Sequence, residues 1–93
     1  MPKFSIEEYT ARYPKATPVQ CPVKGQLLWQ LDVDDASTAP VVGTKVRAGE
    51  VIGHVQTYYG MEDIVAAVDG LIVAVTGTQG STVGKGEIVA FIQ

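Results

Sequence analysis

Few side chains of this sequence belong to types that carry out chemistry, and they are isolated from one another. Cys21 is the only cysteine, which excludes an internal disulfide and a thiolate metal cluster, so we expect a buried, inert thiol. His54 is the only histidine, and without a second one it is interpreted as a strand residue, not a base or ligand. Residues 77–86 lack the Gly-Lys-Ser/Thr ending of a phosphate-binding loop. We expect no independent catalysis.

An acidic segment offers the other candidate chemistry. Asp32, Asp34 and Asp35 lie within four positions, as calcium ligands often do. However, no glycine stands at the sixth place and no glutamate closes the loop, as a calcium-binding loop requires. We therefore predict a solvated acidic loop and no metal site.

Residues 56–66 join the two halves of the chain and are predicted to form a hairpin. Its tip contains two adjacent tyrosines before a glycine, and tyrosine is enriched in contact hot spots. Alternation along a hairpin puts neighbours on opposite faces, so we expect one ring inward, covering the end of the core, and the other exposed. The predicted interaction hairpin consists of Thr57, Tyr58, Tyr59, Gly60 and Met61.

The two halves of the chain resemble each other. Residues 23–29 align with 68–74 at an offset of 45, and residues 43–56 align with 80–93 at an offset of 37. The longer block has five identities in fourteen pairs, two of them glycines at predicted loop positions that favour positive φ. The first half contains eight extra residues between Gly25 and Gly43. An internal repeat indicates two similar sheets related by an approximate twofold axis.

Composition narrows the class of protein. The 93 residues fit one small domain, and 46% of them are hydrophobic without an apolar run near the roughly 20 needed to cross a bilayer. No signal peptide or polybasic stretch opens the chain, so we expect a soluble, cytoplasmic protein without membrane insertion. The net charge of −3 argues against a nucleic-acid partner.

A short helix and a series of strands are predicted. Ser5 and Glu8 have capping-box spacing, with Phe4 and Tyr9 as a hydrophobic staple, so a helix is expected over residues 6–13, before Pro14. Residues 15–18 are interpreted as a linker, which divides the chain into residues 1–18 and a domain of residues 19–93. Expected strands cover residues 19–22, 25–29, 51–56, 61–66, 71–76 and 87–92, with loops at 45–50 and 77–86. The fold class is therefore all-β.

Both half-motifs together are similar to the biotinyl/lipoyl carrier domains. The resemblance spans residues 19–93 and rests on residues 22–25, 43–52, 64–70 and 80–92. It implies a flattened β-barrel of two four-stranded antiparallel sheets, the barrel-sandwich hybrid, with the prosthetic group on a protruding hairpin. The extra residues after Gly25 resemble in place and length the thumb of the bacterial acetyl-CoA carboxylase biotin carrier.

The chain departs from this family at one position. The resemblance places the modified lysine of the Ala-Met-Lys-Met or Asp-Lys-Ala motif at Tyr59, and no lysine occurs between positions 46 and 84. A phenol with a pKa of about 10 has no amine with which to form the amide. No cofactor is expected, although the family carries biotin or lipoate. The remaining lysines lack the family's motif and are not expected to replace it: Lys3, Lys15, Lys24, Lys45 and Lys85.

Two functions are compatible with these observations. The first is a degenerate carrier-like module without biotin or lipoate, which docks in a biotin-dependent carboxylase or decarboxylase assembly and has its subunits as partners. The second is a terminal domain or subunit of such an enzyme, of the oxaloacetate or pyruvate class, that acts as a true carrier through an unusual attachment site.

Overall fold

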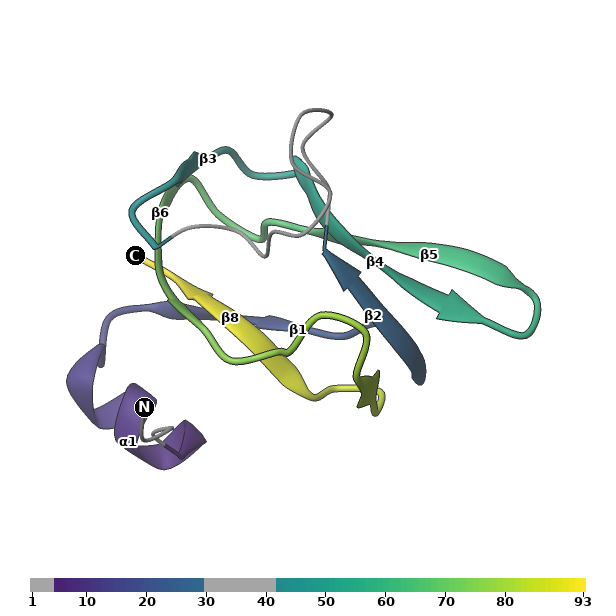
Figure 1. The fold of residues 1–93 in the computed structure, drawn as a ribbon. Coiled ribbons are helices and arrows are strands. Elements are labelled where there is room, and N and C mark those ends of the chain that lie inside the picture. The colour runs from purple at the N-terminus through teal and green to yellow at the C-terminus, as the bar shows by residue number, and fades with distance from the viewer. Residues whose placement is uncertain (1–4, 30–41) are drawn as a thin grey trace.

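Two four-stranded antiparallel sheets form the protein, as expected, in a computed structural model that describes residues 5–29 and 42–93. The sheet orders are β1-β8-β6-β3 and β5-β4-β2-β7. Together they curl into a half-barrel, with α1 at one side and the β4–β5 hairpin projecting at the other (Figure 1). The element bounds are α1 Ile6–Arg12, β1 Thr17–Gln20, β2 Gly25–Trp29, β3 Lys45–Val46, β4 Val51–Thr57, β5 Gly60–Val65, β6 Gly70–Val75, β7 Thr82–Val83 and β8 Ile88–Ile92.

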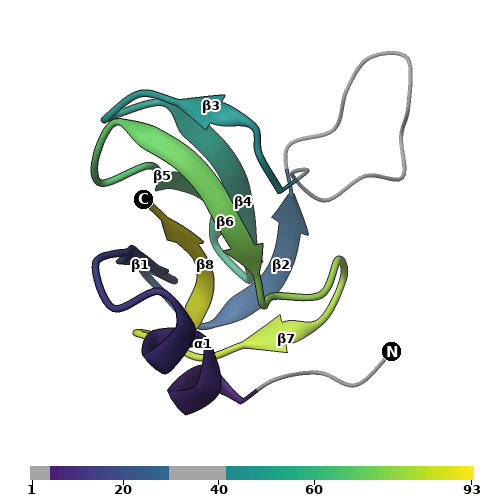
Figure 2. The same cartoon turned by 90° about the vertical axis from the view of Figure 1, so that its left-hand side faces the viewer.

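The N-terminal helix forms where its capping signal predicts. The Ser5 hydroxyl oxygen accepts a hydrogen bond from the Glu8 amide at 3.2 Å, which satisfies one of the free amides of the first turn. The Tyr9 ring stacks on Phe91 of β8, with ring centroids 5.9 Å apart. The helix therefore covers the outer face of β8, seen beside it in Figure 2. Phe4 of the predicted staple lies outside the described residues.

The long strands agree with the sequence, and the short ones were missed. β2 has the predicted bounds, whereas β1 begins at Thr17, two residues earlier than expected and inside the predicted linker. The loops expected at residues 45–50 and 77–86 each contain a strand, β3 paired with β6 and β7 paired with β2. The loop predictions were wrong there because a strand of two residues is too short to show alternation.

Aligned residues of the two halves make the same backbone contacts. The Gly49 amide donates to the Ala66 carbonyl at 2.8 Å, and the Gly86 amide donates to the Cys21 carbonyl at 2.8 Å. Both glycines have positive φ, 85° and 83°, as do Gly43 and Gly80. Under the same alignment, β8, β6 and β3 correspond to β4, β2 and β7, and β1 lies beside β8 as β5 lies beside β4.

The core lies between the sheets and ends near Val55 on the hairpin side. Its largest side chain is Trp29, whose indole nitrogen donates to the Gly77 carbonyl at 3.0 Å. Gly53 pairs with Trp29 across β2 and β4, and a Cβ there would lie 2.9 Å from the indole ring. A glycine is required at this place because the ring occupies the space of any side chain. Within the described residues, no helix is long and apolar enough to span a membrane.

Candidate functional site

A two-residue turn forms the tip of the projecting hairpin. β4 and β5 stay paired up to Thr57 and Gly60, and only Tyr58 and Tyr59 lie between them. The Thr57 hydroxyl oxygen accepts a hydrogen bond from the Tyr59 amide at 3.1 Å and donates one to the Gly60 carbonyl at 3.0 Å. Gly60 has a φ of 137°, which a side chain would strain. The turn is thus fixed by its own hydrogen bonds.

Both tyrosine rings lie in solvent. Tyr58 is 95% exposed and Tyr59 is 94% exposed, with the two rings edge to face and their centroids 5.2 Å apart. The prediction that one ring turns inward was wrong, and neither ring covers the end of the core. Alternation holds for paired strand residues, whereas both tyrosines lie beyond the last pair.

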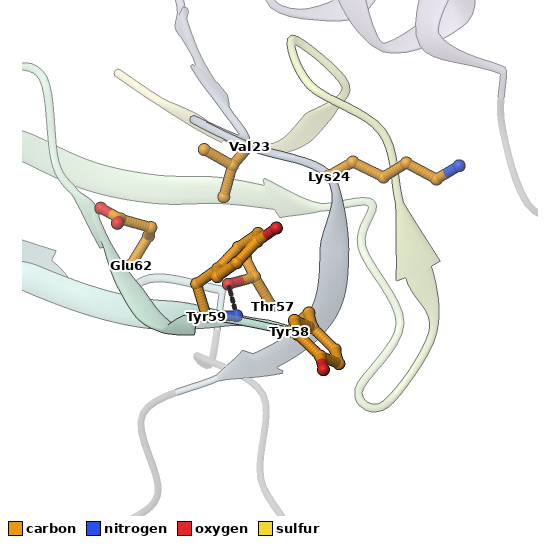
Figure 3. Close-up of a pocket in the computed structure, with 6 residues that line it drawn as sticks. All are labelled: Val23, Lys24, Thr57, Tyr58, Tyr59 and Glu62. Carbon is orange, nitrogen blue, oxygen red and sulfur yellow. Dashed lines mark hydrogen bonds between the residues drawn. The ribbon is translucent and has the colours of Figure 1, made fainter.

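An open pocket of about 410 Å³ lies beneath the tip. Thr57 and Glu62 line it from the hairpin because they share the strand face on which Val55 enters the core. Val23 and Lys24 line it from the segment between β1 and β2 (Figure 3). Tyr59 lies below Val23 in this view, while the two tyrosine rings point in different directions. The pocket combines apolar walls with one amine and one carboxylate.

Lys24 was not predicted to lie near the tip. It is exposed and lines the same pocket as Tyr58 and Tyr59. Sequence separation hides this proximity, which arises only when the β1–β2 segment reaches the hairpin end of the barrel. Lys45 lies in β3 and Lys85 in the turn between β7 and β8, whereas Lys3 is outside the described residues.

His54 is a strand residue, as expected, but it has a partner that the sequence did not reveal. Its Nδ1 lies 3.1 Å from Oδ1 of Asp63, the residue opposite it on β5. The two side chains occupy the outer face of the hairpin and are partly to largely exposed. Nine positions separate them, and only the hairpin register shows that they meet. The pair is a surface contact between strands.

Cys21 is buried, as predicted, and its thiol donates a hydrogen bond to the Val23 carbonyl at 2.8 Å. Burial raises the pKa of this thiol, and the negative charge of Glu87 raises it further, so the nucleophilic thiolate is disfavoured. No three histidine, cysteine or carboxylate residues of the described segments group together as a metal site. The acidic loop predicted at Asp32, Asp34 and Asp35 lies outside those segments.

Solved structures show the same fold within larger proteins, although no protein-family model and no curated protein sequence matches the chain. The urea carboxylase of Kluyveromyces lactis matches 85% of this chain with a TM-score of 0.67 and 19% identity. A single-chain, multi-domain long-chain acyl-CoA carboxylase matches 87% of it with a TM-score of 0.69 and 18% identity. The succinylglutamate desuccinylase/aspartoacylase of Rhodobacter sphaeroides matches 81% with a TM-score of 0.56 and 23% identity.

The matched chains are much longer than this one. The aligned part is 6% of the urea carboxylase, 8% of the acyl-CoA carboxylase and 21% of the desuccinylase/aspartoacylase. At these identities the similarity is one of fold. The chain therefore has the fold of a small part of two carboxylase structures and of a third, differently named protein.

Proposed function

We propose that this chain is a carrier-like domain without attached biotin or lipoate, which docks through its hairpin in a biotin-dependent carboxylase or decarboxylase assembly. Two of the structures with this fold are carboxylases, and in both the match is a small part of a large chain. The resemblance of residues 19–93 to biotinyl/lipoyl carriers supports the same assignment. In this proposal the domain is not itself catalytic.

The proposal rests mainly on which residues form the hairpin tip. A carrier presents its modified lysine at the tip, and here the tip is Tyr58 and Tyr59. When the chain is aligned with the family's motif, Tyr59 stands at the position of the modified lysine. Because a ligase forms an amide with an amine, the Tyr59 phenol offers no equivalent attachment point. The expected cofactor content is therefore none.

The exposed rings support docking. A large aromatic side chain that is more than nine-tenths exposed gains apolar contact only when a partner covers it. Tyrosine has few rotatable bonds, so ordering it on binding costs little entropy. Met61, which is 55% exposed, extends this surface on the outer face of the same hairpin.

The mass of the protein from its native host tests the absence of a cofactor. We expect the intact mass to equal that of the bare polypeptide, with unmodified peptides covering residues 56–66. A mass raised by a biotinyl or lipoyl group would contradict the proposal, and peptide mapping would identify the modified residue.

Binding to purified carboxyltransferase and biotin carboxylase subunits of the same host tests the docking role. Replacing both tyrosines, Tyr58→Ala with Tyr59→Ala, is expected to weaken binding at least tenfold, as the loss of two hot-spot rings does. Leu71→Ala on β6 of the other sheet is the matched control, since it also removes an exposed apolar side chain. Equal binding of the double variant would refute docking through the hairpin.

Lys24 favours a second candidate, a true carrier with an unusual attachment site. Its amine is exposed and belongs to the pocket beneath the tip, close to where the family presents its cofactor. This alternative predicts an added mass on the peptide that contains Lys24, and loss of that mass in Lys24→Arg. The intact-mass measurement therefore separates the two candidates.

A further inference from the structure

The hairpin belongs to a long segment whose only basic side chain is His54. No lysine or arginine occurs between Arg47 and Lys85, while the segment contains the carboxylates of Glu50, Glu62, Asp63 and Asp69. Glu62 and Asp63 are both exposed on β5. At the pocket the charged side chains are Lys24 and Glu62, and on its hairpin side the Glu62 carboxylate favours a positively charged group.

Glu62 is the carboxylate at the pocket. It lines the pocket together with Tyr59, and among the described residues it forms no ion pair. Asp63 differs, since it lies on the outer face of the hairpin and contacts His54 at 3.1 Å. Lys24 also lines the pocket, but its side chain extends away from Tyr59 and Glu62 in Figure 3. Glu62 thus remains available to a ligand.

The tyrosine rings can hold the same ligand. The edge-to-face arrangement leaves ring faces open to solvent, because both rings are more than nine-tenths exposed. A cation binds over such a face, and a planar guanidinium also stacks on it. Guanidinium can in addition form two parallel hydrogen bonds with a carboxylate, which ammonium cannot. Val23 supplies an apolar wall for the methylene groups of the side chain.

We propose that the pocket beneath the hairpin tip binds an arginine side chain of the partner protein, between the Glu62 carboxylate and the faces of Tyr58 and Tyr59. The proposal rests on the docking function above and specifies the chemistry of the partner. The Glu62 carboxylate favours a positively charged group, and the combination of ring faces with a carboxylate selects arginine over lysine.

Nuclear magnetic resonance of the full chain tests this with N-acetyl-arginine amide as the probe. We expect the probe to shift the ring signals of Tyr58 and Tyr59 and the amide of Glu62. Ring currents should move the probe's own side-chain methylene signals upfield. N-acetyl-lysine amide at the same concentration should produce smaller shifts, because ammonium does not stack.

Two variants with the same change in charge provide the control. Glu62→Gln is expected to weaken probe binding about threefold, as the loss of an exposed ion pair does. Asp63→Asn, one position away on the opposite face, should leave it unchanged. No shifts at the tip, equal shifts with the lysine probe, or equal weakening by both variants would overturn the proposal.

The arginine-probe experiment and the tests of the proposed function can fail independently of each other. Loss of subunit binding in the double tyrosine variant, together with no response to the arginine probe, would retain docking and reject the arginine pocket. A biotinylated protein that still binds the probe would reject the cofactor-free function and retain the pocket.

Discussion

The four tyrosines of this chain occupy two kinds of environment. Tyr9 stacks on Phe91 and Tyr13 caps the helix, so both are tied to the N-terminal helix. Tyr58 and Tyr59 contact little except each other. A short domain that leaves two aromatic rings in water forgoes their burial energy, about 1.5–3 kcal/mol for a large apolar side chain. Binding to a partner would recover it.

Cys21 gives a pH-dependent prediction. Burial raises the pKa of its thiol in the folded chain, so the folded state binds this proton more tightly than the unfolded state. The protonated thiol makes its full contribution to the free energy of unfolding below the ordinary thiol pKa, roughly 8.5. This contribution is lost as the pH rises through the pKa of the folded state. We expect the free energy of unfolding to fall more steeply above about pH 8.5 in the wild type than in Cys21→Ala.

Urea unfolding of both proteins between neutral and alkaline pH measures this difference. Parallel pH profiles would show that the thiol titrates equally in the folded and unfolded chains. A thiol reagent should also react slowly with the native protein and rapidly in urea, since the side chain is only 2% exposed.

At the scale of elements, the glycine turns provide a matched test. Gly86 has a φ of 83°, and a Cβ there would meet no atom within 4 Å, so alanine would add conformational strain without a clash. Gly84 lies in the same turn, is equally open and has no positive φ. We expect Gly86→Ala to lower the free energy of unfolding by about 1–2 kcal/mol. Gly84→Ala should change it by less than about 0.5 kcal/mol. Equal effects in chemical denaturation would contradict this explanation.

The hairpin register can be tested by restoring a lysine. Tyr58→Met with Tyr59→Lys should make the domain a substrate for a biotin ligase with biotin and ATP. Gly60 is retained because its φ of 137° disfavours a side chain. The control exchanges the two new residues, Tyr58→Lys with Tyr59→Met. Mass spectrometry should detect biotin only on the first variant, and labelling of the control alone would place the family's lysine at Tyr58.

The elements that could be predicted from the sequence are those marked by a pattern that extends over several residues. The longer strands, the helix cap and the positive-φ glycines follow from alternation, Ser5 with Glu8, and the repeated turns. The two-residue strands β3 and β7 carry no such pattern. Which residues form the hairpin tip was also predictable, but their orientation was not, because alternation does not extend into a two-residue turn.

Contacts between distant segments were out of reach of the sequence. Lys24 reaches the pocket beneath the tip from the β1–β2 segment, and Asp63 meets His54 only in the actual register of β4 with β5. Such contacts depend on how the barrel closes, which no local pattern encodes.

At the scale of the whole molecule, the two sheets differ in what covers their outer faces. Phe91 of β8 is buried beneath Tyr9 of the helix. His54 holds the corresponding place on β4 under the sequence alignment, and there the partner is Asp63 on the neighbouring strand. Among the described residues, the helix therefore covers Phe91 on one sheet, and no corresponding helix lies over His54 on the other.

The pairing of the first strand with the last has a mechanical consequence. Thr17 at the start of β1 lies opposite Ile92 near the end of β8, and this end of the barrel is remote from the hairpin (Figure 1). Tension applied to the chain before Thr17 and after Ile92 would pull two antiparallel neighbours apart from the same end, breaking their hydrogen bonds one after another. The β1–β8 pair would therefore carry the load first, and the hydrogen bonds between β4 and β5 would not be the first to break.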